Sequence, residues 1–157
     1  MTAVLWFRIW SRLYVLVKKE NTKAAYEAYL STYPDAPNRN EALANLFELV
    51  KKENTIAAYD DYFSTYPKTP NRNNALMDMY ELIKKENTIA VYEDYLSKYP
   101  NAPNHNDALS RMYSLMYEPF KKKNTIAAYA DYYSKYPNVP NCNNALFDMY
   151  ELIKNLS

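Results

Sequence analysis

The chain has 157 residues, a formal net charge of +1, and a composition that is 48% hydrophobic and 24% charged, which excludes an intrinsically disordered chain. Glycine is absent, so turns that need glycine at positive φ, including glycine-rich phosphate loops, are disfavoured. The near-neutral charge offers no basic footprint for a nucleic acid, and the single cysteine excludes an intramolecular disulfide.

The N-terminal residues 1–17 are apolar enough to raise the question of a signal peptide or a membrane span. Arg8 and Arg12 lie inside the apolar run, no small-residue cleavage pattern follows, and a span needs about 20 mostly uncharged residues. We therefore expect an uncleaved, soluble and cytoplasmic protein without a membrane span.

The same segment predicts a helix over about 4–20 that carries both tryptophans of the chain, Trp6 and Trp10. A terminal helix has a neighbour on one side only. These tryptophans are therefore expected either to seal the end of the core or to dock on a partner.

A repeat then runs through the chain. The pair Asn-Thr begins at residues 21, 54, 87 and 124, with spacings of 33, 33 and 37. Two further markers keep the same period, Tyr-Pro at 33, 66, 99 and 136, and Pro-Asn-X-Asn at 37, 70, 103 and 140. Repetition at such a period is typical of solenoid proteins.

Each repeat contains two amphipathic helices. Residues 73–86 place apolar side chains on one helical stripe, and residues 55–66 place isoleucine, tyrosine and phenylalanine on another. The second helix is expected to stop before Pro67, because proline cannot continue the hydrogen-bond ladder.

Local signals predict how the helices begin and end. Asn54 is expected to end the first helix in the left-handed conformation, and Thr55 to cap the second. Asn38 with Glu41, like Asn104 with Asp107, has the spacing of a capping box.

Neither helix buries its stripe alone, so the sequence predicts an all-α, right-handed solenoid of tandem helix-turn-helix hairpins with about 33-residue repeats and roughly nine helices. We expect one repeat domain over 1–157. Its units are about 4–37, 38–70, 71–103 and 104–140, followed by a terminal helix at 141–157, with an insertion at 117–120.

The repeat resembles the tetratricopeptide family, in the bacterial variant written A-Y-x-x-Y-L-x-x-Y-P-x-A-P. Residues that carry the match include Ala25-Tyr26, Tyr29-Leu30, Tyr33-Pro34, Ala36-Pro37 and Ala42-Leu43. The resemblance covers about 7–156 and implies protein–protein binding without chemistry. The chain departs from the family in lacking the glycine of the first helix, near the place of Tyr80 and Tyr113.

No residue set predicts an enzyme, a cofactor or a metal site. His105 and Cys142 occupy one repeat position, which is Arg39 and Arg72 in earlier units, so we expect a variable surface site there. A zinc site needs about four ligands, and a nucleophile needs a base that this chain does not offer.

We predict a non-enzymatic scaffold or adaptor that binds a protein or peptide segment of unknown identity. The repeated charged face of the first helices is one expected partner-binding surface, formed by Glu48, Lys51, Lys52, Glu81, Lys84 and Lys85. The alternatives are a structural element that self-associates through its terminal helices, and a regulatory repeat region of a larger multidomain protein.

Two departures from the repeat add candidate contacts. The segment Tyr117-Glu118-Pro119-Phe120 is either a harmless bulge or an aromatic ledge in which Tyr117 and Phe120 contact a partner. The C-terminal helix places Leu146, Met149, Tyr150 and Ile153 on one side and Phe147 on the other. Either the natural chain continues, or this end stacks against another molecule.

Overall fold

The computed structural model describes residues 3–156, and the side chains of residues 9–156. Within that part the chain is all-α, with nine consecutive helices and no strand, as the repeat predicts. The helices are α1 (Ala3–Glu20), α2 (Lys23–Thr32), α3 (Arg39–Glu53), α4 (Ile56–Thr65), α5 (Arg72–Glu86), α6 (Ile89–Lys98), α7 (His105–Lys123), α8 (Ile126–Lys135) and α9 (Cys142–Lys154).

The joint between the two helices of each hairpin is built on asparagine. The four Asn residues of the Asn-Thr pairs are left-handed, with φ between 47° and 52°. Asparagine tolerates this conformation better than other residues that carry a Cβ. The prediction for Asn54 is confirmed, and it holds equally for Asn21, Asn87 and Asn124.

The threonine that follows each asparagine caps the second helix. At Thr55 the side-chain oxygen accepts a hydrogen bond from the Ala58 backbone N–H at 3.1 Å, and Thr22, Thr88 and Thr125 do the same for their own helices. The predicted caps are therefore present in every hairpin.

The expected capping boxes are wrong. Asn38 and Asn104 precede α3 and α7, but neither side chain makes a capping hydrogen bond. The chain enters α3 through a tight turn in which the Arg39 N–H bonds to the Ala36 carbonyl at 3.0 Å. Asn38 consequently has φ −88° and ψ 8°, away from the extended geometry from which an N-cap side chain reaches back.

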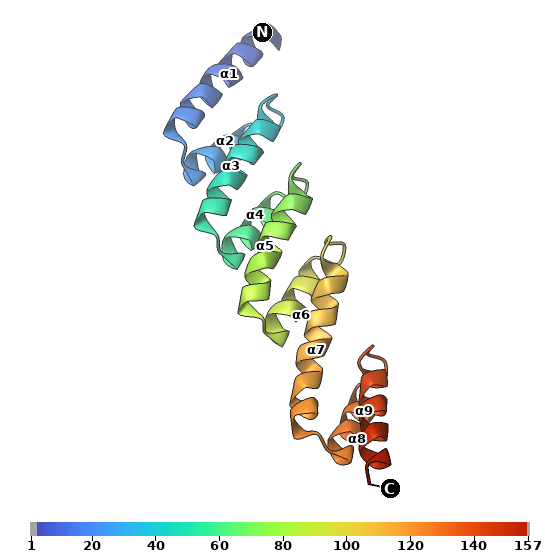
Figure 1. Cartoon of the computed structure of the whole chain (residues 1–157). Helices are drawn as coiled ribbons and strands as arrows, with labels where there is room; N and C mark the ends of the chain where they lie inside the picture. The colour runs from blue at the N-terminus through green and yellow to red at the C-terminus, as the bar shows by residue number, and fades with distance from the viewer. Residues whose placement is uncertain (1–2, 157) are drawn as a thin grey trace. The chain divides into compact units, whose positions relative to one another are not determined.

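The chain forms two compact units, the first ending at Lys85 and the second beginning at Glu86. In each unit the first helices of the hairpins lie in one layer and the second helices in another (Figure 1), so that α3 and α5 lie in front of α2 and α4, and α7 and α9 in front of α6 and α8. Consecutive helices are the packed neighbours in both units. The right-handed winding stays a prediction.

Aromatic side chains fill the space between the layers. In the first unit Phe47 of α3 packs on Tyr59 and Tyr62 of α4, with ring centroids 6.2 and 5.7 Å apart. In the second unit Tyr117, Tyr129, Tyr132 and Ala145 form a buried cluster. Buried aromatic pairs at such distances add to the stability gained from area burial alone.

The four extra residues of the third repeat lengthen α7. This helix has 19 residues where α3 and α5 have 15, and it continues through Pro119. The sequence Met116–Lys122 (MYEPFKK) matches Met79–Lys85 (MYELIKK), both ending just before a joint. Tyr117 therefore occupies the repeat position of Phe47 and Tyr80, and the extra turn lies upstream of it.

Candidate functional site

The lysines of the predicted charged face are partly used within the chain. Lys51 lies 3.4 Å from the Asp78 carboxylate and 5.8 Å from the Phe47 ring centroid. Lys84 pairs with Glu81 at 2.7 Å and lies 5.6 Å from the Tyr80 ring centroid.

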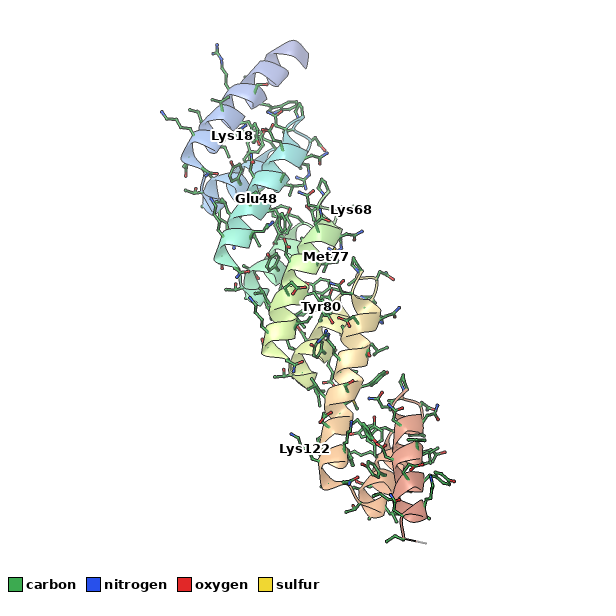
Figure 2. The ribbon with its side chains drawn as sticks, viewed as in Figure 1. Lys18, Glu48, Lys68, Met77, Tyr80 and Lys122 are labelled. Carbon is green, nitrogen blue, oxygen red and sulfur yellow. The ribbon has the colours of Figure 1, made fainter. Side chains whose placement is uncertain are left out.

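The same arrangement appears on α1, where Lys18 pairs with Glu41 at 2.8 Å and lies over Tyr14 (Figure 2). The lysine four residues after a core aromatic thus covers its ring in three successive first helices. Such cation–π contacts are each worth about 0.5–1 kcal/mol at exposed sites. This lysine position has a structural role that the charge pattern alone did not reveal.

The other members of the charged face are freer. Glu48, Lys52 and Lys85 are exposed, and Figure 2 labels Glu48 on α3 and Tyr80 on α5. Of the six predicted residues, these three are available for a partner without breaking a contact within the chain.

The aromatic residues of the predicted ledge belong to the core of the second unit. Tyr117 is buried and packs on Tyr129 and Tyr132, with ring centroids 6.1 and 4.8 Å apart. Phe120 is half-buried and lies 5.1 Å from the Tyr132 ring in an edge-on geometry. The prediction that Tyr117 projects as a ledge is therefore wrong, because the α7 register turns it towards α8.

Tyr117 also connects α7 to α9. Its hydroxyl donates a hydrogen bond to the Asp148 carboxylate, and burial together with that carboxylate raises the pKa of Tyr117 well above its ordinary value. In the first unit Phe47 has no hydroxyl, and the corresponding Asp78 pairs with Lys51 instead. The lysine equivalent to Lys51 is Lys121, which makes no ion pair within the described residues.

Two polar cavities flank this hydrogen bond. One of about 300 Å³ lies between the last turns of α7 and the start of α9, and one of about 400 Å³ lies beside the fourth joint. Lys121 and Asp148 line both. The cavities could hold polar groups of a partner. They bring together no nucleophile with a base, which acyl transfer and related chemistry would need.

The outer surface of α1 is apolar. Val15 and Leu16 are exposed, and with Ser11 and Arg12 they line an open hollow of about 470 Å³. Trp10 is half-buried, while the side chain of Trp6 lies outside the described residues.

The outward face of α9 is apolar as well. Leu146, Phe147, Tyr150 and Ile153 are exposed, whereas Met149 packs on the core cluster of the second unit. The expected side of the helix is confirmed for Leu146, Tyr150 and Ile153. It is wrong for Met149, which faces α8 and the core.

The single histidine and cysteine make no reactive pair. His105 and Cys142 open different helices, α7 and α9. Cys142 is buried, so the expectation of a variable surface position is wrong there, because the tight turn before α9 carries its small side chain inward. Within residues 3–156, no three histidine, cysteine or acidic side chains gather where they could hold a metal ion. In the same range no helix is long and apolar enough to cross a membrane.

One buried tyrosine position separates the repeats chemically. The Tyr62 hydroxyl contacts the Thr69 hydroxyl at 2.6 Å and donates to the Leu43 carbonyl at 3.1 Å. At the equivalent Tyr29 the loop residue is Ala36, and the buried hydroxyl has no hydrogen-bond partner.

We expect Tyr62→Phe to lower the free energy of unfolding by about 1–2 kcal/mol, since it leaves the buried Thr69 hydroxyl and the Leu43 carbonyl unpaired. Tyr29→Phe is the matched control and is expected to be neutral or stabilising. Urea unfolding followed by far-UV circular dichroism measures both. Equal losses in the two variants would contradict the assignment of these hydrogen bonds.

Comparison with known proteins leaves the fold and these surfaces as the basis for function. No protein-family model matches the chain, and no curated protein matches it with significance.

Proposed function

We propose that the chain is a non-enzymatic binding module of tetratricopeptide-like helical hairpins, which holds a partner protein or peptide. The observation that carries the proposal is the exposed apolar stripe of α9, formed by Leu146, Tyr150 and Ile153. Side chains of this size, contiguous on one helix face and exposed to water, are typical of interaction sites. The stripe lies one helix away from the polar cavities around Asp148.

Two further surfaces support the proposal. The hollow on α1 lined by Val15 and Leu16 offers a second apolar contact. The exposed charges Glu48, Lys52 and Lys85 offer polar contacts that could set the orientation of a partner. Aromatic and aliphatic anchors usually carry most of the affinity at a protein interface, and exposed charges carry specificity.

The test is affinity capture from the native cells with three forms of the protein, read by mass spectrometry. These are the unchanged chain, the double variant Tyr150→Glu/Ile153→Glu, and the double variant Lys52→Glu/Lys85→Glu. We expect a partner that is retained by the unchanged chain and lost with the α9 variant, because a charge placed in an apolar contact is costly to desolvate. The same set of proteins on all three forms would contradict the proposal.

Self-association is the second candidate, because α1 and α9 both present apolar surface. Stacking of unlike ends gives rings or filaments. Sedimentation at rising protein concentration separates the two candidates, since a constant monomer mass excludes stacking.

A further inference from the structure

The repeat itself shows what covers the face that α9 exposes. Leu146, Tyr150 and Ile153 are 37–60% exposed, whereas the residues at the same repeat positions of α3, namely Leu43, Phe47 and Val50, are 1–3% exposed. The two helices carry the same stripe, and only their surroundings differ.

On α3 the cover is the second helix α4. Tyr59 and Tyr62 of α4 pack on the Phe47 ring, and the Tyr62 hydroxyl donates to the Leu43 carbonyl at 3.1 Å. The cover is thus an amphipathic helix with tyrosines three residues apart. One tyrosine lies on the aromatic ring, and the other also reaches a backbone carbonyl of the first helix.

The chain also supplies the sequence that best fits α9. Residues 73–84 and 143–154 differ at one position, where Met77 is replaced by Phe147. The segment that follows α5 in the chain is Asn87–Pro103, which contains α6, an N-cap at Thr88, and tyrosines at 92 and 95.

We propose that the outward face of α9 is a docking site for a tyrosine-bearing amphipathic helix of another polypeptide, with the Ala/Val-Tyr-x-x-Tyr pattern of this chain's own second helices. This inference rests on the proposed function and names the class of partner. The first tyrosine of the partner helix packs on the Tyr150 ring. The second donates its hydroxyl to the Leu146 carbonyl, and small or branched residues between them cover Ile153.

A second copy of the chain is a poorer occupant. Its own tyrosines of this kind, including Tyr26, Tyr59 and Tyr129, are buried in its hairpins. To donate such a helix, a second copy would have to unfold a hairpin. A separate helix carries no such cost, although a segment this short must fold as it binds.

The probe is a synthetic peptide of Asn87–Pro103 with blocked ends and a fluorescent label, titrated with the full chain and read by anisotropy. Saturable binding is expected. In the peptide, Tyr95→Phe is expected to weaken binding about fivefold because one hydrogen bond is lost, and replacing both Tyr92 and Tyr95 by alanine is expected to abolish it.

Variants of the full chain locate the site. Ile153→Glu is expected to weaken peptide binding at least about tenfold, whereas Val15→Glu, an equally exposed apolar position on α1, is expected to leave it unchanged. Amide hydrogen exchange, which does not depend on a variant folding well, is expected to slow in residues 145–154 when the unchanged chain binds the peptide.

Three results would overturn the inference: no binding up to about 1 mM peptide, the weakest affinity of interest; binding that is insensitive to Ile153→Glu; or a dimer that requires Ile153 and excludes the peptide. Each of these leaves the broader proposal open, because a partner captured through α1 or through Lys52 and Lys85 would still show a binding module.

Discussion

Between pH 10 and pH 12 the second unit is expected to lose most of its stability. Burial raises the pKa of Tyr95 to about 12, and burial with smaller contributions from neighbouring groups raises the pKa of Tyr132 to about 12. Tyrosine in an unfolded chain ionises near pH 10. The folded state therefore holds these two protons after the unfolded chain has released its own.

The sign follows directly. Below pH 10 both states are protonated, so the contribution of each tyrosine is fully present. As the pH rises from 10 to about 12, ionisation of the unfolded chain lowers the free energy of unfolding by about 1.4 kcal/mol per pH unit for each tyrosine. Across that window each residue accounts for a loss on the order of 3 kcal/mol, and Tyr117, whose pKa is also raised, adds to it.

Urea unfolding at a series of pH values measures the effect, with tyrosinate absorbance recorded alongside. Tyr132→Phe should make the decline above pH 10 shallower. Its neighbour Tyr133 is exposed, so Tyr133→Phe is the matched control and should leave the slope unaltered. Tyrosines that all titrate together near pH 10, without unfolding, would show that their burial is not maintained in solution.

Truncation of Tyr117 is expected to be the most damaging single change in α7. Tyr117→Ala removes a buried ring from the contacts with Tyr129 and Tyr132 and leaves Asp148 without its hydroxyl donor. Loss of a buried aromatic side chain typically costs about 3–5 kcal/mol.

The duplicated Met-Tyr sequence provides the control for this change. Tyr113, one turn earlier in α7, is only half-buried, so Tyr113→Ala should cost less than half as much. The ratio of the two losses, measured by chemical denaturation, reports the register of the extra turn. A larger loss for Tyr113 would mean that the insertion does lie at 117–120 and that Tyr113 fills the position of Phe47.

The joints were predictable because they depend on residues next to each other in sequence. An asparagine after a lysine-rich last turn and a threonine before an apolar run are local signals, and the αL geometry of Asn54 and the cap at Thr55 follow from them. The capping box at Asn38 was also a local signal, but it failed because the turn from Ala36 to Arg39 fixes the backbone first.

The register of α7 could have been predicted, and the partners of its side chains could not. Comparison of MYEPFKK with MYELIKK gives the position of Tyr117 from the sequence alone. Which carboxylate pairs with which cation depends instead on contacts between residues 31 apart, such as Tyr117 with Asp148, or 27 apart, such as Lys51 with Asp78. A change from phenylalanine to tyrosine redirects that choice, so the candidate site around Lys121 appears only in the folded chain.

The asparagine joints have a consequence for the unfolded chain. A glycine at each of these four positions would adopt the left-handed conformation with less strain, yet it would also widen the range of conformations open to the unfolded polypeptide. Asparagine restricts that range and, at Asn124, also accepts a hydrogen bond from Tyr129 at 2.9 Å in the folded state. A chain without glycine therefore loses less backbone entropy on folding, and each hairpin gains part of its stability from conformations that its unfolded form does not visit.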